Sequence, residues 1–269
     1  MEQLRIILSA VSFFLLVAVG RAETPEEKGL AIAREVDIRN RGWVDSSVDL
    51  QMVLENQQGE KSERRLWLRA LEIISSTDGD KSLTYFVAPA DIQGTSLLSF
   101  AKLVGPDDQW LYLPALKRVK RIASSNKSGT FVGSEFSYED FLAQEVERFR
   151  YRFLREEPCP VAEARQLSCF VSERIPTYEN SGYSKQIGWV DTKDYRPWRL
   201  DFFDTKGDQF KRLEFGDYRI YGGKFWRSHD LRMVNLANGK RTSLRFGAYK
   251  LNNGLDKTVF DPDALPRLR

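Results

Sequence analysis

Long segments separated by glycine-containing turns follow one another near the C-terminal end of the chain. The turns TKGD, YGGK and ANGK lie sixteen residues apart, and Asn238-Gly239 is a strong signal for a two-residue hairpin. The turns separate residues 209–221, 224–236 and 241–251, all longer than the mean strand of about 5–6 residues. Long consecutive antiparallel strands require a large sheet that is strongly twisted or curled.

An N-terminal helix is expected before the strands, in TPEEKGLAIAREVDIRNRGW. Thr24 suits the N-cap, Pro25 suits the first turn, and Glu26 and Glu27 favour the positive end of the helix dipole. A terminal helical turn with Asp261 as its cap is expected near the C-terminus. Between them, apolar residues recur with the period of two that is typical of strands: Val48, Leu50, Met52, Leu54, Leu66, Leu68 and Ala70.

Several predicted strands are apolar on both faces. In DDQWLYLPAL, Trp110 and Tyr112 point to one side, and Leu111 and Leu113 point to the other. A sheet with one face in water usually shows polar residues on that face. Such strands are either buried on both sides in an ordinary core, or one face borders an apolar hollow closed by helices. Strand length favours the hollow, and both interpretations stay open on the residues alone.

The first 22 residues have the layout of a secretory signal peptide. Arg5 precedes an apolar run over residues 6–19, which ends in small residues around Gly20 and Ala22. The run is shorter than the roughly 20 residues that a membrane span needs. We expect cleavage after Ala22 and export, with residues 23–269 forming a single domain.

Two cysteines, Cys159 and Cys169, lie ten positions apart in CPVAEARQLSC. Export into an oxidising compartment favours a disulfide that pins the strands flanking this loop. The alternative, a redox pair, normally has the closer C-x-x-C spacing.

Charge and histidine content exclude several classes of protein. Loss of Arg5, Arg21 and Glu2 with the signal peptide lowers the net charge from +3 to +2, which is too little for a field that neutralises nucleic-acid phosphates. The single histidine, His229, cannot supply a multi-histidine metal site and is expected to be structural or at the surface. No catalytic motif is evident, so we predict no catalytic residue, metal or cofactor.

Three acidic residues crowd into GSEFSYEDF, namely Glu135, Glu139 and Asp140. Two acids facing one cleft could serve glycoside hydrolysis. The same stretch also reads as a capped helix start, with Ser137 as the cap and acids in the first turn. The structural interpretation is the favoured one.

Four cations follow the Trp-Tyr strand: Lys117, Arg118, Lys120 and Arg121. Alternation places Arg118 and Lys120 on one face and the other two on the opposite face, so they form no single basic stripe. Docking to a partner, contact with anionic head groups and plain solvation of the strand are the open interpretations.

Three linked motifs resemble the outer membrane lipoprotein-sorting protein family, a branch of the LolA-like periplasmic carriers. They are IQGTSLLSF over residues 92–100, QWLYLPALKRVKRI over residues 109–122 and GTFVGSEFSYEDF over residues 129–141. The resemblance implies an α+β, mostly antiparallel fold: an unclosed, curved β-barrel whose concave face is covered by helices over an apolar cavity. It also implies a periplasmic protein that binds or shuttles lipid-linked or other amphiphilic ligands, in some cases for an inner-membrane exporter of the resistance-nodulation-division type. No catalytic residue belongs to the motifs.

On this reading, eight residues are expected to line or wall the cavity. Gly129 and Gly133 supply the backbone freedom with which two of them, Phe131 and Phe136, fold over as a lid. The basic residues 117–121 are expected to meet head groups or a partner, with transient membrane contact. The expected lining is Trp67, Leu97, Leu98, Phe100, Trp110, Tyr112, Phe131 and Phe136.

The sequence leaves three functional hypotheses open. A non-enzymatic carrier of lipid-like cargo is the leading hypothesis. A periplasmic sensor or accessory subunit that uses the same fold to bind a membrane protein is the alternative. A hydrolase built on two of the acids Glu135, Glu139 and Asp140 is the third, and it requires one polar cleft and a raised pKa.

Overall fold

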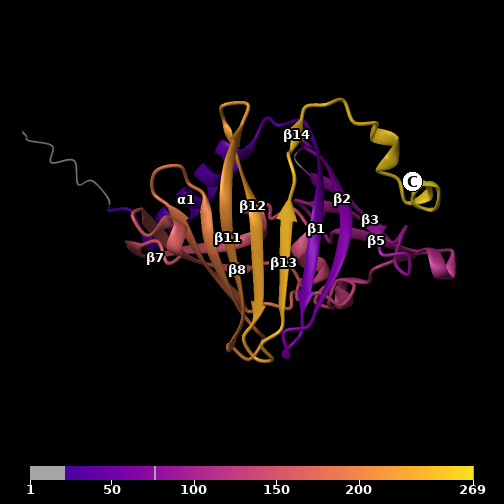
Figure 1. Ribbon diagram of the computed structural model, residues 1–269. Coiled ribbons are helices and arrows are strands. Elements are labelled where there is room, and N and C mark those ends of the chain that lie inside the picture. The colour runs from indigo at the N-terminus through magenta and orange to yellow at the C-terminus, as the bar shows by residue number, and fades with distance from the viewer. Residues whose placement is uncertain (1–21, 76, 269) are drawn as a thin grey trace, which may run out of the picture.

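The computed structural model of the protein describes residues 22–75 and 77–268, and its main feature is one 14-stranded antiparallel sheet (Figure 1). The sheet curls without closing, as the long alternating segments predict. This confirms the unclosed, mostly antiparallel fold. The expected signal peptide lies, except for Ala22, outside the described residues.

The strands are joined mostly by short turns, and the helical structure of residues 22–75 and 77–268 consists of one α-helix and several short 3-10 turns. The α-helix is α1 (Pro25–Asn40). The strands are β1 (Asp45–Glu55), β2 (Lys61–Leu71), β3 (Asp78–Ala88), β4 (Ser96–Lys102), β5 (Asp108–Leu113), β6 (Arg118–Arg121), β7 (Phe149–Pro158), β8 (Ser168–Pro176), β9 (Lys185–Asp191), β10 (Pro197–Phe203), β11 (Gln209–Tyr221), β12 (Phe225–Asn235), β13 (Arg241–Phe246) and β14 (Lys250–Leu251). The 3-10 turns are η1 (Pro114–Leu116), η2 (Ser124–Asn126), η3 (Tyr138–Phe141), η4 (Val146–Arg148), η5 (Ala162–Ala164), η6 (Lys257–Val259) and η7 (Pro262–Arg267).

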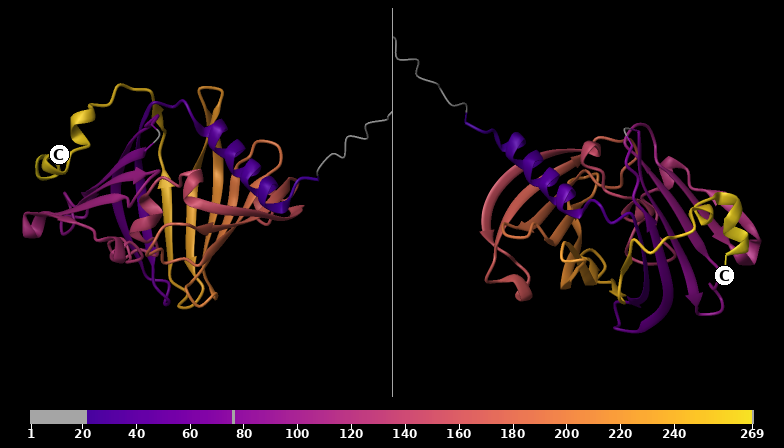
Figure 2. Two further views of the ribbon diagram at one scale, coloured as in Figure 1. Left: turned by 180° about the vertical axis from the view of Figure 1, so that it is seen from behind. Right: turned by 90° about the horizontal axis from the view of Figure 1, so that it is seen from above.

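The order of the strands puts two neighbours in sequence at opposite edges of the sheet. The order is β6-β5-β4-β3-β2-β1-β13-β12-β11-β10-β9-β8-β7, with β14 paired to β1. Strands β6 and β7 are therefore the two edges, and the connection between them, residues 122–148, must cross the whole width of the curled sheet. We call residues 122–148 the covering segment. It crosses on the concave side (Figure 2).

Helix α1 lies on the same concave side, over the β7 end of the sheet (Figure 2). Its predicted N-terminus is confirmed: Thr24 and Glu27 form a capping box, and Pro25 occupies the first turn. Gly29 faces β7 so closely that a Cβ there would lie 2.7 Å from the backbone nitrogen of Phe153. The absence of a side chain at Gly29 thus lets the helix rest directly on the strand.

The C-terminal residues lie on the opposite, convex side, against β4, β5 and β6 (Figures 1 and 2). The expected turn is present as η7, with the Asp261 carboxylate accepting a hydrogen bond from the backbone N–H of Asp263. Residues 241–251 differ from the single long strand that was expected. They are split into β13 and β14, and the backbone N–H of Gly247 instead donates to the carbonyl of Asp49.

The disulfide between Cys159 and Cys169 is present and joins the adjoining ends of β7 and β8, as the sequence predicts. Both cysteines are buried in an apolar cluster with Trp189 and Trp198. The bond thereby fixes the edge hairpin on which α1 rests.

Candidate functional site

The concave face of the sheet carries one continuous apolar cluster. Its members alternate along strands from both halves of the sheet, which is why the long period-two segments produce a single surface. Buried residues of this surface include Met52, Leu66, Phe86, Leu97, Met233 and Leu244. Other members keep part of their surface exposed: Leu54, Leu68, Leu200, Phe215, Leu231 and Phe246.

The covering segment packs aromatic side chains onto this apolar face. Phe131 is completely buried, with its ring centroid 4.3 Å from that of Phe141 and 5.6 Å from that of Phe86 on β3. Phe136 is 4% exposed and belongs to the same cluster. The part of the concave face in front of β3 is therefore filled by the chain's own aromatic residues.

A tight loop presents these two phenylalanines. The backbone N–H of Phe131 donates to the carbonyl of Phe136 over 2.8 Å, which closes the loop. Val132 and Gly133 both take positive φ values, 46° and 74°. Glycine adopts this conformation freely, whereas for a β-branched valine it is strained. Gly133 thus meets the expected need for backbone freedom in the loop.

Buried charges fix one part of the covering segment to the β4–β5 connection. The Asp107 carboxylate accepts from the Lys127 ammonium at 2.7 Å and from the Arg148 guanidinium at 3.3 Å. All three side chains are at most 8% exposed. Arg148 also donates to the carbonyls of Lys102 and Gly105 at 2.8 and 2.6 Å. Lys127 and Arg148 lie toward opposite ends of the covering segment, so one carboxylate holds both.

A second polar anchor is the buried carboxylate of Glu139. It accepts hydrogen bonds from the N–H of Gly182 at 2.8 Å, the hydroxyl of Ser181 at 2.9 Å and the hydroxyl of Tyr178 at 3.3 Å. Burial raises the pKa of Glu139, the neighbouring Asp140 raises it further, and the three donors partly offset the rise. The carboxylate ties the covering segment to the β8–β9 connection.

The eight residues expected to line a cavity are divided between the two faces of the sheet. Leu97, Phe131 and Phe136 belong to the concave cluster. The other five belong to a separate cluster on the convex face, where Phe260 and Leu265 of the C-terminal residues cover them. Those five are Trp67, Leu98, Phe100, Trp110 and Tyr112. Leu97 and Leu98 separate because adjacent strand residues point to opposite faces.

Trp67 also borders a pocket of about 310 Å³ on the convex side, together with Arg69 and Leu255. Its ring stacks on that of Tyr85 at 4.9 Å, and the Arg69 guanidinium lies 4.3 Å from the Trp67 ring. This pocket and the concave cluster therefore lie on different sides of the sheet.

The four cations of residues 117–121 lie at the β6 edge and are all exposed. Lys117 precedes the strand in a left-handed conformation, and Arg121 forms an ion pair with Asp108. Val119, between them, packs against the convex cluster. The structure thus presents the cations to solvent beside an apolar layer.

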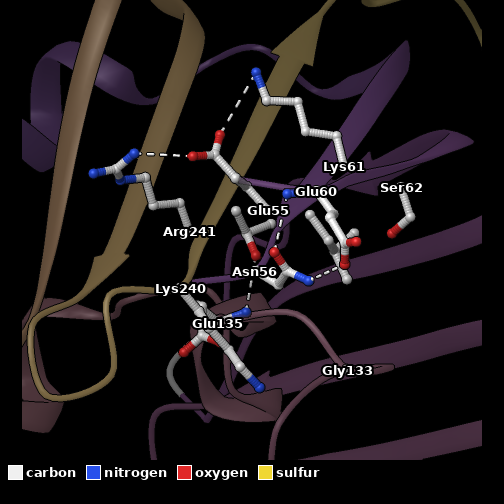
Figure 3. Close-up of a pocket in the computed structure, with 11 residues that line it drawn as sticks. Glu55, Asn56, Glu60, Lys61, Ser62, Gly133, Glu135, Lys240 and Arg241 are labelled. Atoms are coloured by element: carbon white, nitrogen blue, oxygen red, sulfur yellow. Dashed lines mark hydrogen bonds and ion pairs between the residues drawn. The ribbon is translucent and has the colours of Figure 1, made fainter. Parts of the chain in front are cut away.

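A pocket of about 360 Å³ opens where the β1–β2 and β12–β13 turns meet the covering segment (Figure 3). Charged side chains of both signs surround it, and apolar Leu54 connects it with the concave cluster. It is lined by Leu54, Glu55, Asn56, Glu60, Lys61, Ser62, Gly133, Glu135, Lys240, Arg241 and Thr242.

The candidate hydrolase acids do not face a common cleft. Glu135 bonds Asn235 of β12 and lines the pocket of Figure 3, whereas Glu139 bonds the β8–β9 connection. Asp140 completes a capping box with Ser137 at the start of η3, as the structural interpretation predicts. His229 is buried; its Nδ1 donates to the Phe246 carbonyl, and its Nε2 is hydrogen-bonded with the Tyr221 hydroxyl.

Neither a metal-binding cluster nor a membrane-spanning helix occurs in the described residues. Within residues 22–75 and 77–268, no three or more His, Cys, Asp or Glu side chains are grouped so as to hold a metal ion. None of the helices in the same residues has both the length and the apolar character required to cross a membrane.

Several residues that shape the site carry no local signal in the sequence. Asp107, Lys127 and Arg148 are separated by twenty or more positions and meet only because the covering segment crosses the sheet. Asn235 and Thr242 flank a recognisable hairpin turn, but their contacts with Glu135 span about a hundred positions. Of the residues that shape the site, only those of the loop 129–136, with its glycines, serine and phenylalanines, were recognisable from the sequence.

Comparisons with known proteins agree with this architecture. A family model described as an uncharacterised protein matches residues 78–267, and no curated protein matches the chain. A crystal structure of an outer membrane lipoprotein-sorting protein domain from Vibrio parahaemolyticus is 45% identical, with a TM-score of 0.85, and the alignment covers 90% of this chain and 100% of that one. A DUF1329 family protein from Desulfovibrio piger is 27% identical, with a TM-score of 0.83, covering 90% of this chain and 99% of that one.

A LolA superfamily protein from Nitrosomonas europaea shares the fold at 17% identity, with a TM-score of 0.68 and coverage of 87% of this chain and 98% of that one. The identity and the nearly complete coverage of the Vibrio structure go beyond a shared fold. The chain belongs to the outer membrane lipoprotein-sorting protein family, within the LolA superfamily fold.

Proposed function

We propose that the protein is a periplasmic, non-enzymatic carrier of lipid-like or lipidated amphiphiles, which it binds on the concave face of the sheet. The observation that carries the proposal is the continuous apolar cluster on that face, which is covered by a helix and a loop segment instead of a second sheet. The 45% identical Vibrio domain, described as lipoprotein-sorting, supports the same class of cargo.

Partly exposed residues of the concave cluster are the proposed contact surface for an acyl chain. Leu200, Phe215, Leu231 and Phe246 come from four neighbouring strands, β10 to β13, and each keeps part of its side chain exposed. Removal of acyl chain from water would supply about 0.8 kcal/mol per buried CH₂. A chain of ordinary length would therefore bind without any polar contact.

The covering segment is the proposed lid. Phe131 and Phe136 occupy the concave face in front of β3, so a longer ligand reaches Leu97 only if they move aside. The anchors at Asp107 and Glu139 hold the segment by polar contacts, and water can replace these when the segment lifts. Of the eight residues expected to line the cavity, we therefore keep Leu97, Phe131 and Phe136 beside this contact surface and leave the five convex residues outside it.

The exposed cations of residues 117–121 are the proposed contact with anionic head groups or a delivery partner during transient membrane contact. An inner-membrane exporter of the resistance-nodulation-division type is the partner that the family resemblance suggests. The exposed edge strand β6 presents Arg118, Lys120 and Arg121 on a rigid element, which suits brief electrostatic docking.

Native mass spectrometry with lipid extraction, on the mature protein purified from periplasm, tests the proposal. Leu231→Glu places a charge on the concave face, and Trp110→Glu places the same charge on the convex face. We expect a bound amphiphile in wild type and in Trp110→Glu, and at least a roughly ten-fold loss in Leu231→Glu, with circular dichroism unchanged in both.

Two results would contradict the assignment. Equal loss in the two variants would return Trp110 and its neighbours to the lining. If wild type carries no amphiphile and takes none from lipid vesicles, the carrier proposal fails. Co-purification with a membrane protein would then favour the sensor or accessory-subunit alternative.

A further inference from the structure

The charged side chains around the pocket of Figure 3 do not all form ion pairs with one another. Glu55 accepts from Arg241 at 2.9 Å and lies 3.6 Å from the Lys61 ammonium. Glu60 accepts from the Asn56 amide at 2.6 Å. The third acid of the pocket, Glu135, is the buried one of the three. Among the described residues, neither Glu135 nor the exposed Glu60 faces a cation within 4.0 Å.

Glu135 is held rigidly in this position. Glu135 is 8% exposed. Its Oε2 accepts from the Asn235 amide at 2.7 Å, and its backbone N–H donates to the Thr242 hydroxyl at 3.0 Å. Asn235 is itself fixed, because its Oδ1 accepts from the backbone of Ala237 and Asn238 in the hairpin turn. The second carboxylate oxygen, Oε1, has no donor within hydrogen-bond distance in the described part of the chain, and Glu135 lines the pocket.

The mouth of the pocket carries the opposite charge. Lys240 is exposed, and within residues 22–75 and 77–268 its ammonium has no carboxylate oxygen within 4.0 Å. Lys61 is exposed as well and is 3.6 Å from Glu55. An inner carboxylate oxygen and an outer ammonium are thus left for a ligand that carries a cation at one end and an anion next to it.

We propose that this pocket binds a primary ammonium joined to a phosphate, as in the phosphoethanolamine head group of a lipid. The ammonium donates to Glu135 Oε1, and the phosphate faces Lys240 and Lys61. The inference rests on the proposed carrier function, since Leu54 connects the pocket with the apolar concave cluster that would take the acyl chains. The volume of about 360 Å³ suits a head group and is at the small end of ligand pockets.

The direction of the head group follows from the depth of the charges. A phosphate at the inner end would meet the Glu135 carboxylate and would be repelled. A trimethylammonium could lie there but could not donate a hydrogen bond, so a buried carboxylate should distinguish the primary amine from choline.

The test is an NMR titration of the folded mature chain with two water-soluble compounds that have no acyl chain, glycerophosphoethanolamine and glycerophosphocholine. We expect saturable shifts at Glu135 and Thr242 with the ethanolamine compound and about ten-fold weaker binding of the choline compound. Glu135→Gln keeps the size and an acceptor for Asn235, and should weaken ethanolamine binding about ten-fold. Glu60→Gln, at an exposed acid of the same pocket, should leave ethanolamine binding unchanged.

A second experiment measures the extraction of lipid from phosphatidylethanolamine and phosphatidylcholine vesicles. If the head group of a lipid is the natural source, wild type should extract the ethanolamine lipid in preference, and Glu135→Gln should extract both alike. Binding of the free compound without any preference among vesicles would assign the pocket to a soluble phosphoethanolamine instead. Equal titration by both compounds, or an unchanged Glu135→Gln, would overturn the proposal.

The carrier function is tested separately by the same variants. Glu135→Gln should still take up acyl chains, because the concave cluster is intact, whereas Leu231→Glu should lose acyl uptake and keep the ethanolamine titration. Failure of the head-group pocket is thereby distinguishable from failure of the carrier proposal.

Discussion

Helix α1 and the covering segment both lie on the concave face, but they are attached to it in different ways. The helix rests on β7 through Gly29, where strand backbone lies 2.7 Å from the position of a Cβ, and through the Lys28 ammonium 3.8 Å above the Phe153 ring. The covering segment also packs aromatic side chains on the sheet, but its links to the β4–β5 and β8–β9 connections are made at buried carboxylates, those of Asp107 and Glu139. Close backbone contact makes a permanent wall, whereas polar contacts have an alternative partner in water.

Helix α1 and the covering segment, the two covers of the concave face, should therefore behave differently. The close contact of the helix with the strand backbone at Gly29 leaves no room for water, so the β7 side of the concave face should stay closed. An attachment made by hydrogen bonds and ion pairs can exchange them for water, so the side toward β3 is the one that should open for a ligand.

Asp107→Asn should release the covering segment. The change leaves Lys127 and Arg148 buried without their carboxylate, and removing one member of a buried ion pair typically costs about 3–5 kcal/mol. Hydrogen exchange should speed up through residues 122–148 while α1 keeps its protection. The exposed pair Asp217–Arg219 provides the control, because Asp217→Asn should leave exchange in residues 122–148 unchanged. Equal acceleration in α1 would show that the two covers open as one unit.

Removal of the disulfide should weaken the opposite side of the concave face. Replacing Cys159 and Cys169 together by alanine frees the β7–β8 hairpin on which α1 rests. Closing a loop of this size contributes about 2–3 kcal/mol in the chain-entropy account. Urea unfolding should show a loss of this order, and hydrogen exchange should now rise in β7 and α1. A rise confined to residues 122–148 would contradict the assignment of α1 to the permanent wall.

Gly29→Ala should destabilise the protein although alanine is the better helix former. Elsewhere in a helix this change gains about 1 kcal/mol, but here the new Cβ meets backbone that cannot move aside, at a cost of about 1–3 kcal/mol. Ala31→Gly, at an exposed position of the same helix, is the matched control and should lose about 1 kcal/mol from propensity alone. A gain in thermal stability in Gly29→Ala would mean that the helix does not rest on β7.

Local patterns predict much of this fold because each depends on residues close together in sequence. Three features that were predicted from such local patterns are the capping box of Thr24 and Glu27, the bounds of β11 and the short disulfide loop. The loop of residues 129–136 was also recognisable, because the residues that form it, including Gly133 with its left-handed backbone, are close together in sequence.

The identity of the two covers could not be predicted, because it depends on strand order. Helices were expected over the concave face, and among the described residues it is covered by α1 and by a loop segment that contains the 3-10 turns η2, η3 and η4. The segment lies there because β6 and β7 are opposite edges of the sheet. Alternation separates Leu97 from Leu98 but does not say which of them faces the concave side, so the expected lining mixed residues of both faces.

The two covers meet at Asp80, where the pH dependence of stability offers the last test. Its backbone N–H donates to Glu145 at the end of the covering segment, and Glu145 lies 3.4 Å from Arg41, the residue after α1. Burial raises the pKa of Asp80 to about 6, the N–H of Ile73 and Arg41 lower it, and Glu145 and Glu72 add to the rise. The folded protein thus holds this proton more tightly than the unfolded chain does.

The stability that this proton provides is fully present below the ordinary pKa of 3.8 and is lost as the pH rises through about 6. Urea unfolding should therefore show wild type gaining about 1 kcal/mol more than Asp80→Asn when the pH falls from about 7.5 to about 5. Asp208→Asn, in an exposed turn, should keep the wild-type slope. The same slope in wild type and in Asp80→Asn would show that this carboxyl group titrates alike in the folded and unfolded chains, and that the helix and the covering segment meet there without burying a charge.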